Sequence, residues 1–369
     1  MRKLDDLKKD GFKLGATGSG STDIDLALIS LRISLAAYFS TYESQKHFLH
    51  IFDGTHSEAD VDLHHMRSYS ERCAETIVHI QHFFELVCKK ILRDEHPLLV
   101  DINSTNAIVL HKLLTNDTLS QDEEAGVGSI ELSTALKRLF ALLEDDRIKN
   151  TALANCLEKH RQTISAVNDL RNRVWHRGLH ILRYPALDDL MGGYVLPCVD
   201  DMMTMPLLAG HLAMWRYKTL DCGIDPIDEI IRSYKNGSAS VQKTSFLKEL
   251  GRAAYSDAPH AEKAKVGKAV DFTTLFDRTK RVQAERLARA KATASASEVD
   301  NCPVCGLATL VVLEDLDGDF DDGPNGETWR YTYRINCVNC TLDMIHEVGN
   351  ASAHGLPSIK DFWTAYKLS

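Results

Sequence analysis

Four of the nine cysteines lie in two CxxC pairs near the C-terminal end of the sequence. Cys302 and Cys305 form the first pair, and Cys337 and Cys340 form the second. A two-residue gap lets both thiolates of a tight turn reach one metal ion, and two such turns complete a tetrahedral site. The spacing therefore predicts one structural Zn²⁺ held by these four cysteines, with no open position for catalysis. The other five cysteines are scattered singly, which favours reduced thiols in a cytoplasmic protein.

The 31 residues between the two pairs are expected to form a long β-hairpin. Ala308 to Leu313 is apolar, Glu327 to Asn336 alternates, and the turn-rich segment DGDFDDGPNG lies between them. The alternation predicts an aromatic face and a basic face on the second strand. We expect the aromatic face to form the small core of the module. The alternative is that this face is a surface that stacks on a single nucleic-acid strand. The first face contains Trp329, Tyr331, Tyr333 and Ile335, and the second contains Arg330, Thr332 and Arg334.

A second group of chemistry-bearing residues lies in the segment VNDLRNRVWHRG, residues 167–178. Helical spacing puts Asn172 and His176 on one face, with Arg171 beside them. The apolar stripe of this helix places Arg171 where an apolar residue is expected, and a buried unpaired guanidinium is costly. Arg171 is therefore expected to face a carboxylate, a second subunit or an anionic ligand. A forked cation, an amide and an imidazole in one patch can hold a phosphate and move a proton.

This segment resembles the HEPN domains, the higher eukaryote and prokaryote nucleotide-binding family. The family's motif is an arginine followed, after four to six residues, by a histidine, and an asparagine often comes directly after the arginine. Arg171, Asn172 and His176 match that pattern, and a small residue, Gly178, follows the histidine.

A second segment extends the resemblance. The residues FFELVCKKIL, 83–92, look like the first core helix of the family, with Glu85 as its acidic residue and Lys89 or Lys90 as its basic one. The resemblance covers about residues 65–220. It implies a helical bundle that forms a homodimer, so that the motifs of two subunits meet.

The resemblance also implies a metal-independent endoribonuclease used in anti-phage defence, in abortive infection or as a toxin, with an antitoxin or defence-system protein as a partner. His176 would accept the proton of the ribose 2′-hydroxyl, Arg171 would stabilise the charge on the phosphorane, and Asn172 would orient the phosphate of the RNA. Arg173 and Arg177 are the expected substrate-binding residues. The products would be a 2′,3′-cyclic phosphate and a 5′-hydroxyl. The alternative is a non-catalytic protein that binds nucleic acid, dimerises or serves as a scaffold.

The elements that must position these residues are mainly α-helices. Apolar residues recur every three or four positions in several segments, whereas strand-like alternation begins only after residue 307. We therefore expect a HEPN-like helical bundle, followed by a helical linker and a small β zinc-ribbon module. The helical patterns cover residues 23–38, 73–91, 106–114, 130–143, 151–175 and 199–220.

The composition suggests four consecutive parts. Residues 261–291 hold nine basic and four acidic side chains, which favours a solvated helical linker, with a phosphate-contacting arm as the alternative. The expected parts are an N-terminal helical region at 1–64, a HEPN-like helical domain at 65–235, a basic helical linker at 236–300, and a zinc-ribbon domain with a C-terminal tail at 301–369.

The distribution of charge along the chain indicates how the protein would contact RNA. The chain has 43 basic and 52 acidic residues, a charge of −9, and residues 261–291 contribute +5, so the rest carries −14. This balance excludes a general binder with a broad basic face and predicts selective contact with RNA. The most apolar segment, Leu26 to Phe39, contains Arg32, and the N-terminus has no apolar signal region, so no membrane association is expected.

Overall fold

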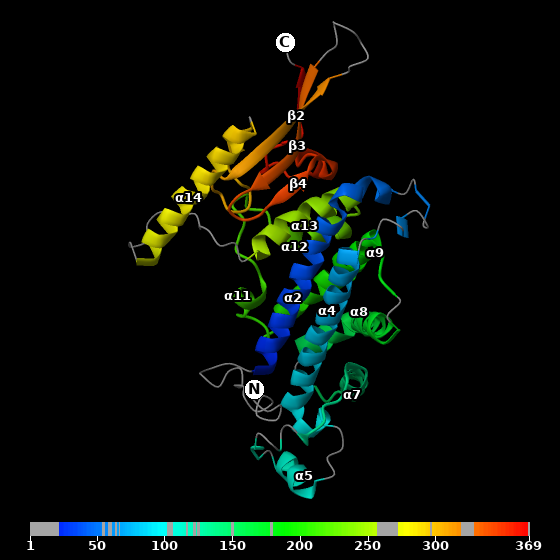
Figure 1. The fold of residues 1–369 in the computed structure, drawn as a ribbon. Helices are drawn as coiled ribbons and strands as arrows, with labels where there is room; N and C mark the ends of the chain where they lie inside the picture. Colours follow the sequence, from blue (N-terminus) through cyan, green and yellow to red (C-terminus); the bar gives the residue numbers. More distant parts are fainter. Residues whose placement is uncertain are drawn as a thin grey trace, which may run out of the picture. The chain divides into compact units, whose positions relative to one another are not determined.

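The computed structural model contains helices through most of the chain and strands near its C-terminal end (Figure 1). At some positions inside helices and strands only the backbone is described, namely residues 22, 23, 53, 151, 153, 154, 175–177, 272–278, 317, 318, 328, 366 and 367. The residues that the structure describes are 22–53, 56–57, 61–62, 65, 67–101, 106–115, 117–120, 123, 126–148, 151–177, 180–256, 272–295, 297–318 and 328–367.

The contacts divide the chain into two compact units, each assembled from three segments. Unit 1 comprises Met1–Leu35, Ala74–Ile181 and Pro197–Arg216. Unit 2 comprises Ala36–Cys73, Leu182–Leu196 and Tyr217–Ser369. These units interleave along the sequence and do not correspond to consecutive parts. The four consecutive parts expected from the composition stay a prediction.

Unit 1 is helical, and its helices form where apolar side chains recur at helical spacing. The stripe of α4 that runs from Cys73 to Ile91 is buried as expected, and the structure also confirms the buried stripe of α2. Hydrogen bonds add to this packing: Ser34 Oγ donates to the carbonyl of Thr76 at 2.8 Å. The helices that contribute to this unit are α2 (Thr22–Gln45), α4 (Arg67–Glu95), η2 (Pro97–Leu99), α5 (Ala107–Leu114), α7 (Leu132–Glu144), α8 (Thr151–Arg177), α10 (Leu196–Met203) and α11 (Leu212–Trp215).

The single helix expected over residues 199–220 is wrong. Helix α10 ends at Met203, turns follow, and only the short α11 continues the helical pattern. Pro206 lacks a backbone N–H for a helix, and Gly210 has a φ of 91°, which favours glycine and stops a right-handed helix.

Unit 2 contains the helices α12 (Pro226–Lys235) and α13 (Val241–Tyr255). Asp225 caps α12 through its Oδ1, which accepts from the backbone N–H of Ile227, and Ser240 caps α13 in the same way. Sequence reasoning missed the elements α9 (Tyr184–Leu190) and η3 (Met191–Val195), the second of which is a π-helix. A short 3₁₀ segment, η1 (Lys46–Asp53), also belongs to this unit.

Helix α13 is mostly buried, although the sequence placed its residues in a basic helical linker at 236–300. Eleven of its fifteen residues are buried, including Phe246, Leu247 and Leu250. Its polar residues reach the interior because they have partners there, as in the ion pair between Lys248 and Asp188. Residues 241–255 therefore form part of the core of unit 2.

Gly251 allows α13 to pack closely against the ring of Phe39. A Cβ atom built on Gly251 would lie 2.6 Å from that ring, a distance that forces a shift. Alanine gains about 1 kcal/mol of helix propensity over glycine, whereas overpacking costs about 1–3 kcal/mol. We expect Gly251→Ala to lower the free energy of unfolding, measured by urea denaturation. The matched control Gly126→Ala, whose Cβ has no neighbour within 4 Å, should not; equal values for both variants would contradict the packing argument.

The C-terminal part of unit 2 contains an antiparallel sheet in the order β1-β2-β3-β4, with β5 also paired to β3. The long hairpin expected from the sequence is confirmed by the pairing of β2 with β3. The strands are β1 (Glu298–Asp300), β2 (Leu310–Gly318), β3 (Thr328–Cys337), β4 (Asp343–Ile345) and β5 (Ala365–Lys367), and the short helical turns η5 (His346–Val348) and η6 (Ser352–His354) follow β4.

A bulge in β3 changes the two faces expected for this strand. Leu313 pairs with Arg334, but Glu314 pairs with Thr332, so Tyr333 is an extra residue in the ladder. The bulge shifts the alternation, and Ile335 shares its face with Thr332, which is also buried. The prediction of an aromatic core is therefore wrong: Tyr333 is 38% exposed and Trp329 is 42% exposed.

Helix α14 (Phe272–Ala294) supplies the missing core of the module. Ala288 and Ala292 pack against Val311 of β2, and Figure 1 shows this helix beside the sheet. Its short side chains allow close approach, and Lys291 Nζ donates to Asn336 Oδ1 at 2.8 Å. Among the basic residues of 261–291, Lys280, Arg286, Arg289 and Lys291 are exposed, Arg281 pairs with Glu285, Lys263, Lys265 and Lys268 lie outside the described residues, and so does the side chain of Arg278.

One segment of the described chain, Ile24–Phe52, is long and apolar enough to cross a membrane, although the sequence predicted no such segment. Within the apolar window of this segment, 61% is buried inside the protein. A buried core helix passes the same test of length and composition, so this feature is weak evidence for a membrane span.

Candidate functional site

The structure brings the four predicted cysteines together. The ligand atoms of Cys302, Cys305, Cys337 and Cys340 all lie within 4.8 Å of one another. The Sγ atoms of Cys302 and Cys340 are 3.4 Å apart, and those of Cys305 and Cys337 are 3.8 Å apart. A tetrahedral ion with metal–sulfur bonds of about 2.3 Å separates its ligands by about 3.8 Å, whereas a disulfide requires about 2.05 Å. The cluster therefore fits a metal ion.

Two tight turns present these thiols. In the first, the backbone N–H of Gly306 donates to the carbonyl of Cys302 at 2.8 Å, and Gly306 has a φ of 71°. In the second, Thr341 adopts a φ of 61°, and the N–H of Cys337 donates to the carbonyl of Leu342. The left-handed residue after each CxxC pair reverses the chain, which lets both thiols point to the same side.

Polar neighbours surround the sulfur atoms. Thr309 Oγ1 lies 3.2 Å from Cys337 Sγ, and the N–H of Cys340 donates to the same sulfur at 3.4 Å. Hydrogen bonds from the Cys302 thiol lower the pKa of Cys305 and of Cys337, whereas burial raises the pKa of Cys302. A bound cation would favour the thiolate at all four positions.

Helix α13 holds the second turn, a connection that sequence reasoning missed. Arg252 donates to the backbone carbonyl and the hydroxyl of Thr341, and the carboxylate of Glu249 accepts from the N–H of Asp343 at 2.6 Å. Arg252 also pairs with Glu249 at 2.6 Å. Burial raises the pKa of Glu249 to about 7, although its hydrogen bonds from Arg252 lower it. In the sequence this i, i+3 pair looks like an ordinary solvated pair, so no signal distinguished it.

The predicted site on α8 is described in part. Arg171 and Asn172 are half-buried, and Arg171 Nη1 donates to Asn172 Oδ1 at 3.2 Å, while Arg173 is exposed. The backbone of α8 continues to Arg177. The side chains of His176 and Arg177 lie outside the described residues, so their approach to Arg171 stays a prediction.

The acidic and basic residues expected on α4 form an ion pair. Lys89 Nζ lies 2.6 Å from Glu85 Oε1, and the side chains of Lys89 and Glu85 are 10% and 21% exposed. Gln81 donates to the other carboxylate oxygen at 2.9 Å. Lys90 instead pairs with Asp94, so Lys89 is the basic partner.

A buried ion pair in unit 2 was not expected from the sequence. Lys248 pairs with Asp188, and its Nζ lies 3.8 Å from the ring centroid of Tyr184 and 4.7 Å from that of Tyr38. Burial lowers the pKa of Lys248 and raises the pKa of Asp188. Because the Lys248 side chain is 0% exposed, no substrate reaches it, and the pair serves to position α9 against α13.

Comparison with known proteins gives no relative for this geometry. The chain matches no protein-family model, no curated protein and no solved structure. The candidate sites therefore stand on their residues alone.

Proposed function

We propose that this chain is a metal-independent endoribonuclease of the HEPN type, with its site at the C-terminal end of α8. The observation that carries the proposal is the unbroken helix over Thr151–Arg177, which keeps the spacing of the motif helical. Asn172 and His176 are separated by about one turn, and Arg171 is joined to Asn172 by a hydrogen bond. One helix end thus carries the cation and the amide side by side.

The chemistry is a transesterification that needs no metal. The imidazole of His176 accepts the proton of the ribose 2′-hydroxyl, and the 2′-oxygen attacks the adjacent phosphorus. The bond from phosphorus to the 5′-oxygen breaks, which yields a 2′,3′-cyclic phosphate, and the leaving oxygen takes a proton to become a 5′-hydroxyl. Arg171 stabilises the charge that grows on the phosphorane, and Asn172 orients the phosphate.

The same proposal assigns the partners. Arg173 is exposed and binds the RNA backbone together with Arg177. The protein acts as a homodimer that brings two motifs together, and it acts in the cytoplasm as part of an anti-phage or toxin system with a neutralising partner protein. The five cysteines outside the cluster form no disulfide, which agrees with a reducing compartment.

The ion proposed for the four-cysteine cluster is Zn²⁺ in a structural role. The donor set is entirely sulfur, which suits zinc better than magnesium or calcium, and four protein ligands leave no open position. The four residues that would hold it are Cys302, Cys305, Cys337 and Cys340.

The second candidate is a non-catalytic nucleic-acid-binding or scaffold protein. It is favoured by the exposed basic residues of α14, such as Arg286 and Arg289, which suit phosphate contacts without any catalytic group. The two candidates differ in whether RNA is cut.

The deciding experiment incubates zinc-loaded protein with single-stranded RNA in magnesium-free buffer, with and without brief addition of EDTA. Retained zinc is checked after the assay, so that loss of metal from the cluster is not mistaken for loss of catalysis. Cleavage that leaves 2′,3′-cyclic phosphate ends supports the nuclease. RNA binding without cyclic phosphate at any pH supports the second candidate and overturns the first. Toxicity on expression in cells, compared with the His176→Ala variant, tests the proposed biological role.

A further inference from the structure

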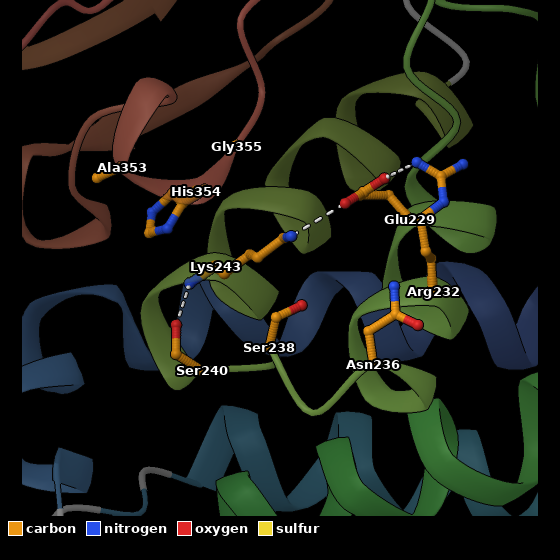
Figure 2. Close-up of a pocket in the computed structure, with 9 residues that line it drawn as sticks. All are labelled: Glu229, Arg232, Asn236, Ser238, Ser240, Lys243, Ala353, His354 and Gly355. Atoms are coloured by element: carbon orange, nitrogen blue, oxygen red, sulfur yellow. Dashed lines mark hydrogen bonds and ion pairs between the residues drawn. The ribbon is translucent and has the colours of Figure 1, made fainter.

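A polar cavity of about 500 Å³ lies in unit 2, where the end of α12, the start of α13 and the short helical turn η6 meet (Figure 2). Pockets that hold small organic ligands measure about 300–1,000 Å³, so the space exceeds what a bare ion needs. The residues that line it are Glu229, Arg232, Asn236, Ser238, Ser240, Lys243, Ala353, His354 and Gly355.

A single carboxylate holds two cations at this cavity. Glu229 Oε1 lies 2.9 Å from Lys243 Nζ, and Glu229 Oε2 lies 2.5 Å from Arg232 Nη1. The side chains of Glu229 and Lys243 are only 11% and 9% exposed, whereas that of Arg232 is 64% exposed. Two positive charges and one negative charge leave a net charge of +1 in this part of the lining. The shared carboxylate fixes both cations in place before any ligand arrives.

Neutral polar side chains also line the cavity. Ser240 Oγ accepts from the backbone N–H of Lys243 at 3.1 Å, so its own hydroxyl proton points to a different acceptor. Figure 2 shows the side chain of Asn236 below Arg232, and that of Ser238 on the side toward Lys243. The positive end of the α13 dipole adds to the attraction for an anion.

The opposite wall adds little charge. His354 Nε2 donates to the carbonyl of Val348 at 2.6 Å, and the ring packs edge-on against Phe246. Burial lowers the pKa of His354, which favours the neutral ring at pH 7. The positive charge is therefore concentrated on the side of Arg232 and Lys243, and the remaining space suits a polar, uncharged body.

We propose that this cavity binds a small phosphate monoester, with the phosphate on Arg232 and Lys243, which flank the Glu229 carboxylate. The guanidinium of Arg232 and the ammonium of Lys243 donate charge-assisted hydrogen bonds to the phosphate oxygens. The sugar or nucleoside body occupies the space toward His354. This site uses no residue of α8, so its test is independent of the proposed ribonuclease activity.

The test is isothermal titration calorimetry of the full chain with inorganic phosphate, ribose 5-phosphate and 5′-AMP, and with ribose and adenosine as uncharged counterparts. We expect the two esters to bind and the uncharged compounds to give no heat. The tighter ester identifies the source of the phosphate, a sugar phosphate or a nucleotide.

Variants locate the binding in the cavity. We expect Arg232→Gln and Lys243→Met each to weaken the binding of the esters by at least about tenfold, since each removes a charged donor. Lys235→Gln removes the same charge from an exposed position on α12 outside the cavity and should leave the affinity unchanged. Because Lys243→Met deprives Glu229 of a partner and so threatens folding, the exposed Arg232 keeps the test valid.

Three results would overturn the proposal. The first is the absence of heat with both esters at millimolar concentration. The second is binding of inorganic phosphate alone, which would reduce the cavity to an ion site. The third is an equal loss of affinity in Lys235→Gln and Arg232→Gln, which would show only general electrostatic attraction.

Discussion

His176→Ala is expected to lower the rate of RNA cleavage by about 10²–10⁴-fold, the contribution of a positioned general base. The 2′-hydroxyl is a poor nucleophile until its proton is removed, and alanine offers no acceptor. The rate is measured on a short RNA in magnesium-free buffer, with the cyclic phosphate end as the readout. Because Asn172 would still orient the phosphate, RNA binding should persist in this variant.

The matched control is His111→Ala, which removes an exposed imidazole from α5 in the same unit. It should cleave at the rate of the unaltered protein. Arg171→Ala should also reduce cleavage, whereas Arg67→Ala, which removes a guanidinium that is 92% exposed, should not. Unchanged cleavage in either His176→Ala or Arg171→Ala would sink the proposed site.

Pairing the two substitutions separates catalysis from folding. If Arg171 and His176 act on the same transition state, the double variant loses little more activity than the more damaging single variant, because residues that act as a unit are not additive. If the losses add, the two residues act independently. Circular dichroism checks that α8 persists, since Arg171 is half-buried and its loss has a structural cost as well.

Periodicity predicted helices such as α2 and α4, and the hairpin of β2 and β3, because local physics determines these elements. The stripe of α4 needs only apolar side chains at helical spacing, and all of its positions from Cys73 to Ile91 are buried. The cysteine cluster was equally predictable from the sequence, because two CxxC pairs can hold one metal ion only if their thiols meet. These features depend on short segments, which are visible in the sequence.

Features that depend on distant partners were missed. The burial of α13 requires Asp188, which lies sixty residues before Lys248 and gives no periodic signal. The bulge at Tyr333 depends on the register of β3 against β2, and alternation alone cannot reveal one extra residue. The phosphate cavity joins Arg232 and Lys243 to a turn more than a hundred residues later. In each case the decisive contact is nonlocal, and composition made Lys248, Arg232 and Lys243 look like solvated charges.

Removal of the metal is expected to unfold the β module of unit 2. Structural zinc sites contribute about 10–16 kcal/mol of apparent binding free energy in small zinc-finger peptides. This exceeds the folding free energy that a small sheet has without its metal. Without the ion, three buried thiols and the half-buried thiol of Cys305 replace four metal bonds. The turns at Gly306 and Thr341 would then lose the attachment that holds β2, β3 and β4 together. Hydrogen exchange at the amides of β2 and β3 should therefore rise sharply after chelation, while the amides of α4 remain protected.

Single substitutions of a metal ligand test the same site without a chelator. Cys302→Ser should lower the zinc content well below one per chain and expose the sheet to exchange, because a serine oxygen is a poor ligand for zinc. Cys156→Ser removes a half-buried thiol outside the cluster and should retain one zinc per chain. A metal assay that finds no zinc in the unaltered protein, or full zinc in Cys302→Ser, would refute the site. Because Arg252 and Glu249 attach the second turn to α13, loss of the metal should also raise exchange at the C-terminal end of that helix.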